Sequence, residues 1–446
     1  MKHYEIEELI AYVDERSSMG SEIEAHAAEC AACADDLGWL RRTILTLSQK
    51  HFWETARPIP SASLAEILDL ADRMHEEEAD AQWQCDEILA QPAPWRLQQL
   101  RRTAGTRAAG IVRTLLERTR AMTDRAPAAA LEITTMACSV AETLDNETYP
   151  PEFIGILHGQ ALRTHAYLLS FTGQPHDALE CAERARKRIE WIPGAGCELA
   201  RVAYVRAAAL QQIDRAEEAV RLLQDAAQTF IRHGEQDWYV NARIAEGAAL
   251  YDMGAVERAL AVWRSVEGDR TLDELGTVRI AHNIALCLAD LGQPAAAVAA
   301  AARCVADFER LGHITERTRS RTVLGRALLA CGRADEAIPI LRQTHREYTE
   351  LNLFVEAALA SLELAEGLLV TNRPHDVPAL CREVIALCTK AGMRQPAATA
   401  LAYLREALAL GTATPRLVRD ARVFLRRSCA EQPRVFARGP GGDREG

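Results

Sequence analysis

The chain has 446 residues and a formal net charge of −11, from 52 basic and 63 acidic residues. This acidic balance argues against general binding to nucleic acid or to an anionic membrane surface. Aromatic residues make up only 5% of the chain, and alanine is abundant. Because strands favour aromatic and β-branched side chains, this composition argues against an all-β fold and favours helix.

The N-terminus does not have the pattern of an export signal. Residues Met1–Ser18 are acidic and lack a basic segment followed by an apolar core. No apolar run approaches the roughly 18 residues that a membrane-spanning helix needs. Ten of the 12 cysteines are scattered singly among helical patterns, which suits buried, reduced thiols. We therefore expect a cytoplasmic protein without a membrane partner.

The first fifty residues predict a small helical module. Glu5–Glu15 has an amphipathic pattern, a second helix carries His26 and Cys30, and Ala34–Ser48 has an apolar side. A module of this size buries little apolar core, so a bound metal would add stability.

His26, Cys30 and Cys33 form the sharpest motif, His-x3-Cys-x2-Cys. A His and a Cys four apart on a helix point the same way, and a Cys-x2-Cys turn brings two sulfurs within reach of one metal ion. Imidazole and thiolate ligands suit one structural Zn²⁺, and His3 is the candidate for the fourth ligand. The alternative is an exposed histidine beside two thiols that act as small apolar side chains.

This arrangement resembles the zinc-binding domain of anti-sigma factors over residues 1–50, with His3 where that family more often has Cys. The resemblance implies binding to a sigma factor of the extracytoplasmic-function type, and in some members release when the metal site is oxidised. Such domains joined to helical repeats also resemble regulatory adaptors without a sigma partner. Both interpretations stay open at this point.

Residues 51–104 are predicted to form a linker that contains an acidic helix. Pro58 and Pro60 open it, and Glu54–Ala90 holds ten acidic residues. The helix Leu64–Leu89 has an apolar stripe, so its charges can simply form a solvated face. The alternative is an autoinhibitory contact with a basic surface elsewhere in the chain.

A repeat of about 40 residues runs through most of the remaining chain. A residue type that tolerates a left-handed backbone is followed five residues later by a small residue. The turn residues are Gly173, Asp214, Gly254, Gly292, Gly332 and Asn372, and the small residues are Ala178, Ala219, Ala259, Ala297, Ala337 and Val377. Each unit has an apolar helix before the turn and another after it, for example Pro151–Leu169 and His176–Arg188.

Stacking such helix pairs buries faces that one pair cannot bury alone, so the pattern predicts an α-solenoid. The Gly-to-Ala spacing resembles the tetratricopeptide (TPR) repeat, although the period is longer than usual and HEAT-like repeats are the alternative. We predict an all-α protein, with a zinc-binding module at 1–50 and a TPR-like solenoid superhelix at 105–430. The arginine-rich Pro415–Ser428 would cap its end, and 431–446 would be a disordered tail.

The first helix of each unit is expected to line a concave groove. In the TPR frame, several of its groove positions in the first five units are polar, and none carries an acidic residue. They include Gln160, Arg163, Tyr167, Arg201, Tyr204, Asn241, Arg279, His282, Asn283, Arg319 and Arg326. Arginine suits carboxylates, so we expect an acidic peptide or helix as ligand. Alternatively, these arginines keep the groove hydrated or pair with acids on the second helix of each unit.

Enzyme motifs are missing from the sequence: it has no phosphate-binding glycine loop, no dinucleotide fingerprint and no His-Glu-x2-His helix. The sequence therefore predicts a non-catalytic regulatory protein whose partner is a protein or peptide. A sigma factor is the first candidate, and a signalling adaptor role is the alternative.

Overall fold

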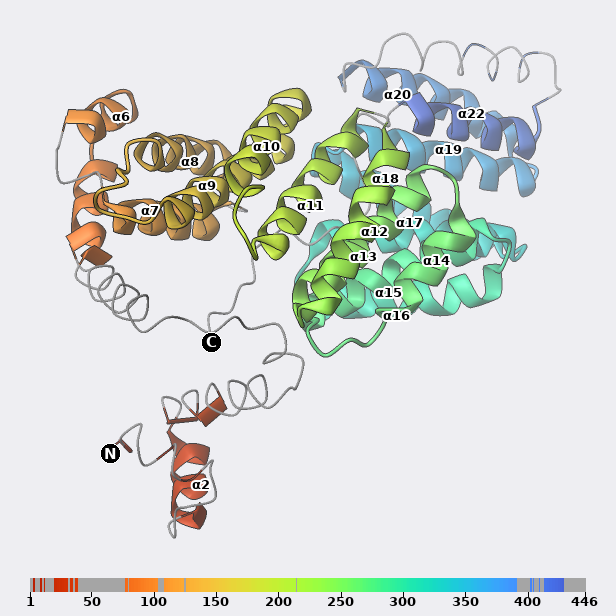
Figure 1. The fold of residues 1–446 in the computed structure, drawn as a ribbon. Coiled ribbons are helices and arrows are strands. Elements are labelled where there is room, and N and C mark those ends of the chain that lie inside the picture. The colour runs from red at the N-terminus through yellow and green to blue at the C-terminus, as the bar shows by residue number, and fades with distance from the viewer. Residues whose placement is uncertain are drawn as a thin grey trace. The chain divides into compact units, whose positions relative to one another are not determined.

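The computed structural model describes residues 3–4, 9, 12, 20–30, 33–34, 37–38, 77–78, 80–102, 108–123, 126–213, 215–390, 402, 404, 409 and 413–428. Within these residues every regular element is helical, which confirms the all-α prediction (Figure 1). The chain divides into two compact units, Met1–Glu76 with Gly442–Gly446, and Glu77–Gly441. Each unit is described separately below.

The N-terminal unit is organised around helix α2, Gly20–Glu29. Ile23 of this helix packs with Leu9 and Leu37 in a small apolar core. These two leucines come from the segments predicted as the first and third helices, which otherwise lie largely outside the described residues. The predicted second helix is present and carries His26, but α2 ends at Glu29, so Cys30 follows the helix and does not lie within it.

The larger unit is built from helix pairs that follow one another along the chain (Figure 1). The first helices of the pairs are α7 Ala109–Met122, α9 Pro151–Phe171, α11 Gly196–Gln212, α13 Gln236–Asp252, α15 Glu274–Asp290, α17 Ile314–Ala330 and α19 Phe354–Val370. The second helices are α8 Pro127–Ala141, α10 Pro175–Ile189, α12 Ala216–Arg232, α14 Val256–Arg264, α16 Pro294–Arg310, α18 Ala334–Glu350 and α20 Val377–Lys390. Helix α6, Ala93–Arg102, precedes them, and the 3₁₀ turn η2, Pro374–Asp376, precedes α20.

The turns within the pairs have the backbone that the sequence predicted. Positive φ angles occur at all four predicted turn glycines and at Asn372, where φ is 56°. At Gly173 the turn is closed by the amide of Gln174, which donates to the carbonyl oxygen of Leu169 at 2.8 Å. Asp214 lies outside the described residues.

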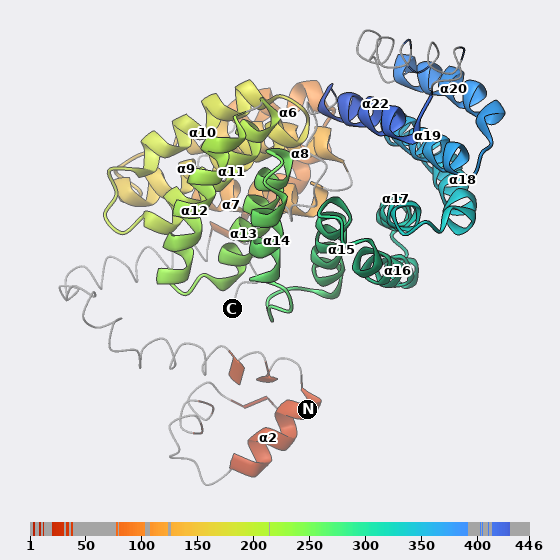
Figure 2. The ribbon, with the colours of Figure 1, turned by 90° about the vertical axis from the view of Figure 1, so that its right-hand side faces the viewer.

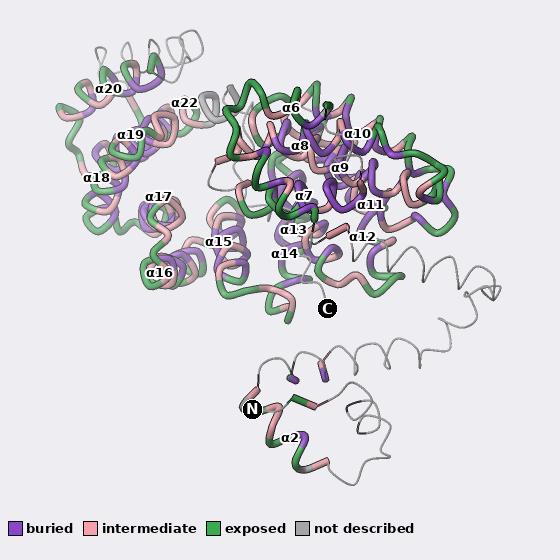
Figure 3. Tube along the Cα trace, turned by 90° about the vertical axis from the view of Figure 1, so that its left-hand side faces the viewer, coloured by how far each residue is buried: buried purple, intermediate pink, exposed green. Residues whose placement is uncertain are grey.

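The small residue after each turn lets the two helices of a pair approach closely. Ala178, Ala219, Ala259, Ala297 and Ala337 are all fully buried. Figure 3 shows buried and exposed positions alternating along these helices, as expected where each helix packs against neighbours on one side only. Consecutive first helices also pack against one another, for example α15 against α17 and α17 against α19. They therefore form the inner face of the TPR-like solenoid.

Two segments lie differently from the sequence prediction. Residues 77–102, predicted as linker, belong to the compact unit of the solenoid. The described part of the acidic helix, residues 77–78 and 80–89, pairs with α7 through Asp86 and Arg118 at 2.8 Å. Helix α22, Pro415–Ser428, which we predicted to cap the end of the solenoid, packs against α19, a first helix (Figure 2).

Candidate functional site: a His/Cys cluster and the inner face

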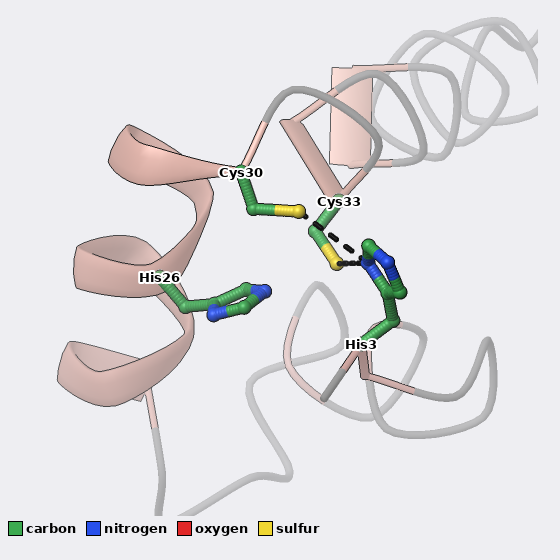
Figure 4. Close-up of side chains that lie close together, drawn as sticks. All are labelled: His3, His26, Cys30 and Cys33. Carbon is green, nitrogen blue, oxygen red and sulfur yellow. Dashed lines mark hydrogen bonds between the residues drawn. The ribbon is translucent and has the colours of Figure 1, made fainter. Parts of the chain in front are cut away.

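All four predicted metal ligands lie together in the N-terminal unit (Figure 4). One ligand atom from each of His3, His26, Cys30 and Cys33 lies within 4.8 Å of all the others. Nδ1 of His3 is 3.4 Å from Sγ of Cys30 and 3.6 Å from Sγ of Cys33. In a tetrahedral zinc site with bonds of about 2.0–2.3 Å, neighbouring ligand atoms lie about 3.3–3.8 Å apart. The spacing of these donors therefore fits one Zn²⁺.

The local backbone explains why these side chains converge. The amide of Cys30 donates to the carbonyl oxygen of His26 at 2.9 Å, so both residues point from one side of the last turn of α2. The amide of Ala34 donates to the carbonyl oxygen of Cys30 at 3.0 Å, and this next turn returns Cys33 to the cluster. Cys33 is only 2% exposed.

Nε2 of His26 is buried and has no hydrogen-bond partner among the described residues. Its ring is held edge-on against Tyr4, with ring centroids 5.2 Å apart. Burial of an imidazole nitrogen without a partner is unfavourable, and coordination of a metal ion would remove that cost. The orphaned nitrogen is a second sign, independent of the spacing, that the cluster suits a metal.

Groove arginines on the inner face are paired with acidic side chains of the same chain, which corrects the expectation of a free basic surface. Arg279 lies 3.3 Å from Glu316, Arg319 lies 4.0 Å from Glu356, and Arg326 lies 3.1 Å from Asp290. These acids lie on first helices, not on second helices as the alternative had it. The paired arginines make this stretch of the face mixed in charge.

Trp238, which the sequence analysis missed, organises the beginning of the inner face. The guanidinium groups of Arg163 and Arg201 lie 5.5 and 5.2 Å from its ring centre. Both arginines also pair with Glu198, which accepts a hydrogen bond from Gln160 at 3.1 Å. Cation–π contacts and shared ion pairs hold these arginines in fixed positions.

Several of the predicted groove residues are buried instead of facing solvent. Tyr204 is 4% exposed and packs edge-on against Trp238. His282 is buried and hydrogen-bonds to Oγ of Ser320 at 2.8 Å. Asn283 is 1% exposed, and neither polar side-chain atom has a hydrogen-bond partner among the described residues.

The other two predicted groove residues are less deeply buried. Tyr167 stacks on Phe171, with ring centroids 6.1 Å apart. Asn241 is half-buried, and its Oδ1 has no hydrogen-bond partner in the described part of the chain.

The C-terminal end of the inner face carries a cluster of charged side chains that pair with one another. It extends from Asp290 and Arg326 to Glu363 and Glu366 of α19, which pair with arginines of α22. Its ion pairs are Arg326–Asp290 at 3.1 Å, Arg422–Glu363 at 3.1 Å, Arg422–Glu366 at 3.8 Å and Arg419–Glu366 at 2.9 Å. The hydroxyl of Tyr251 donates to Asp290 at 2.5 Å.

The missed partners had a signal in the sequence. Glu198, Trp238, Glu316 and Glu356 each lie 16 residues before the turn of their own unit, so they share one repeat position. That position lies three residues before the first one we counted as facing the groove. Because the units stack, the residue at this position lies beside a groove arginine of the preceding unit.

One hydrogen-bonded chain has the residue types of a hydrolase triad. Nδ1 of His345 lies 2.9 Å from Oγ of Ser361, and its Nε2 lies 3.0 Å from Glu383. Ser361, however, is fully buried and its hydroxyl also donates to the carbonyl oxygen of Ala357 at 2.9 Å. A nucleophile must reach its substrate. We therefore conclude that these hydrogen bonds hold α18, α19 and α20 together.

Comparisons with known proteins place the fold. No family model and no curated protein matches the sequence. Among solved structures, the apo form of RapI matches with 14% identity, covering 72% of this chain and 99% of that chain, at a TM-score of 0.50. Aspartyl phosphate phosphatase F from Bacillus subtilis matches with 12% identity, covering 87% of this chain and 96% of that chain, at a TM-score of 0.49.

The apo form of the quorum sensor NprR from B. thuringiensis matches with 14% identity over 72% and 98% of the two chains, at 0.45. At such identities a likeness bears on architecture alone. Within the described residues, no helix combines the length and apolar character needed to cross a membrane. The larger unit is thus a TPR-like helical-repeat solenoid.

Proposed function

We propose that this protein is a non-catalytic regulatory protein that binds a protein or peptide partner, with a zinc-stabilised N-terminal module joined to a TPR-like array. The convergence of His3, His26, Cys30 and Cys33 carries the proposal for the module. The array supports it because a stack of first helices exposes an extended inner face that suits binding rather than catalysis.

The proposed zinc ion would be structural, held by two imidazoles and two thiolates with no open position for a substrate. Bound there, it would link the segment around His3 to α2 and to the turn that carries Cys33. Since the core around Ile23 is small, much of the folding free energy of the module would come from metal binding.

Metal analysis of the freshly reduced, purified chain tests this site. We expect about one zinc per chain, and its loss in Cys33→Ser with unfolding of the module but little change in helical circular dichroism. Cys331→Ser, a half-buried solenoid cysteine, is the matched control and should retain zinc. A metal-free wild-type protein, or full zinc in Cys33→Ser, would refute the proposal.

The partner that we propose for the module is a sigma factor of the extracytoplasmic-function type, with an adaptor role as the alternative. The alternative is favoured by the size of the array, which offers a partner surface separate from the module. Affinity purification from the native host, with the wild-type chain and with Cys33→Ser as baits, distinguishes the sigma-factor role from the adaptor role. A sigma factor recovered only with the wild type supports the first; another signalling protein recovered with both supports the second.

The inner face is proposed to take an acidic peptide segment by exchange of ion pairs. Ligand carboxylates would replace Glu316 and Glu356 as partners of Arg279 and Arg319, which are 28% and 27% exposed. Such an exchange keeps the two arginines paired while it releases Glu316 and Glu356 from these contacts. Arg offers the planar donor pair that carboxylates fit.

A synthetic peptide of residues 64–89, which is rich in acids, serves as the probe. We expect Arg279→Glu with Arg319→Glu to abolish its binding, and Glu316→Gln with Glu356→Gln to strengthen it by removing the internal competitor. Binding should weaken with salt, because exposed charges are screened within about 10 Å at 0.1 M. Unchanged affinity in both double variants would show that the peptide does not bind at this face.

A further inference from the structure

Helix α22 is bound to the inner face in the way that a separate ligand would be. It reaches α19 with Arg422 and Arg419, three residues apart, which pair with Glu363 and Glu366. Val418 and Ala421, each next to one of these arginines in the sequence, enter the apolar core beside α19. One face of α22 thus presents arginines and small apolar residues to an acidic, partly apolar receptor surface.

The acidic half of this contact is built into the solenoid itself. Glu363 is only 3% exposed and Glu366 9%, both on α19. Against the effect of burial, Asp290 and Tyr251 raise the pKa of Arg326 of α17 most, and Glu363 adds to that rise. Two buried carboxylates facing the inner face need cationic partners, and a helix with arginines at i and i+3 supplies them.

The contact combines partly buried ion pairs with two buried apolar side chains, Val418 and Ala421. Burial raises the pKa of Glu366 above its ordinary value, although Arg422 and Arg419 oppose this. Burial also lowers the pKa of Arg422 despite its two carboxylate partners. Both directions show that desolvation outweighs the attraction for these groups, as is common for buried ion pairs.

We propose that the C-terminal end of the inner face is a binding site for an arginine-bearing amphipathic helix of a partner protein, which α22 fills in the free chain. The partner helix would carry arginines three residues apart and an apolar residue immediately before each of them, as α22 does with Val418 and Ala421, and would enter when α22 leaves. This proposal rests on the proposed partner-binding role, but it uses different residues and the opposite ligand charge from the acidic-peptide site.

A two-step experiment on the full chain tests it. Arg419→Glu with Arg422→Glu should release α22, seen as faster hydrogen exchange of residues 415–428 by mass spectrometry with exchange in α11–α17 unchanged. Arg416→Glu is the matched control, since Arg416 is exposed on the same helix, and should leave α22 protected. Glu366→Gln, a milder change at a nearly isosteric side chain, should shift exchange in the same direction as the double variant.

A labelled peptide of residues 415–428 should then bind the released chain. It should bind the wild-type chain at least about 30-fold more weakly, because tethered α22 competes at an effective concentration of about 1 mM. Adding Glu363→Gln and Glu366→Gln to the released chain should weaken the peptide at least about 30-fold.

Equal protection of α22 in all variants would overturn the proposal. So would peptide binding that ignores Glu363 and Glu366. Neither result depends on the residue 64–89 peptide, so a failure at Arg279 and Arg319 is distinguishable from a failure here.

Discussion

Ion pairs between consecutive units hold individual arginines of the inner face in place. Arg279 reaches Glu316 on the next first helix, and Arg319 repeats the contact with Glu356. Partly exposed pairs of this kind contribute about 0–1 kcal/mol each, so their main effect is to hold each guanidinium in one orientation. A ligand that binds there meets a prearranged donor geometry.

His282 predicts how the solenoid responds to acid. Burial, with smaller contributions from the charges of Arg319 and Arg326, lowers its pKa from 6.5 to about 3. The unfolded chain therefore takes up a proton at a pH where the folded chain does not. Stability is complete above pH 6.5 and falls as the pH drops from there toward 3, by about 2 kcal/mol at pH 5.

His282→Gln keeps a hydrogen-bonding group beside Ser320 and removes this titration. We expect it to reduce the loss of unfolding free energy between pH 7 and pH 5 by about 2 kcal/mol in urea titrations. His176→Gln, at an exposed histidine, should leave the pH dependence unchanged. An identical pH 7 to pH 5 difference in wild type and His282→Gln would contradict the assignment.

Paired helices fit one another by complementary volume. Gly247 of α13 faces Trp263 of α14, and Gly325 of α17 likewise faces Leu341 of α18. In both units the glycine lies seven residues before the turn residue and the large residue lies nine residues after it. Where the first helix carries alanine instead, as at Ala166, the matching residue can also be small, as at Ala182. Gly247 and Gly325 thus make room for one large side chain each.

Gly247→Ala tests this fit. A Cβ at Gly247 would lie 2.4 Å from Nε1 of Trp263, whose ring is fully buried and donates to the carbonyl oxygen of Ile244 at 3.1 Å. Overpacking should lower the unfolding free energy by about 1–3 kcal/mol, measured by urea denaturation. Gly196→Ala is the control, since its Cβ would meet only Thr229, at 4.0 Å; equal stability of the two variants would exclude the overpacking.

The whole chain contains two compact units that hold their cysteines in different ways. In the solenoid, burial raises the pKa of Cys287 and of Cys304 to about 12, so neither presents a thiolate near neutral pH. In the N-terminal unit, Cys30 and Cys33 would instead be protected by the proposed zinc. Loss of the metal should therefore expose the thiols of one unit only.

Alkylation with iodoacetamide, followed by peptide mass spectrometry, measures this difference. After chelation we expect rapid modification of Cys30 and Cys33, while Cys287 and Cys304 stay unmodified until urea unfolds the solenoid. The non-chelated protein provides the control, with all four protected. Simultaneous labelling of the four cysteines on chelation would mean that the units do not unfold independently.

The sequence by itself determined the features that depend on local spacing. Gly173 and Asn372 mark turns because a left-handed backbone favours those residue types, and the small residues after the turns are buried because helix pairs must approach closely. The His26, Cys30 and Cys33 spacing likewise brings three of the proposed ligands together at one helix end and the turn after it. These contacts join residues close in the chain, so the pattern contains them.

Only the tertiary structure decided which charges meet. Arg279 and Glu316 are 37 residues apart, and they come together because successive units stack with a definite offset that a repeat period does not specify. The burial of His282, the Trp238 contacts and the packing of α22 on α19 have the same origin. Each depends on how one helix pair rotates against the next, and that rotation is set by the fit of many side chains at once.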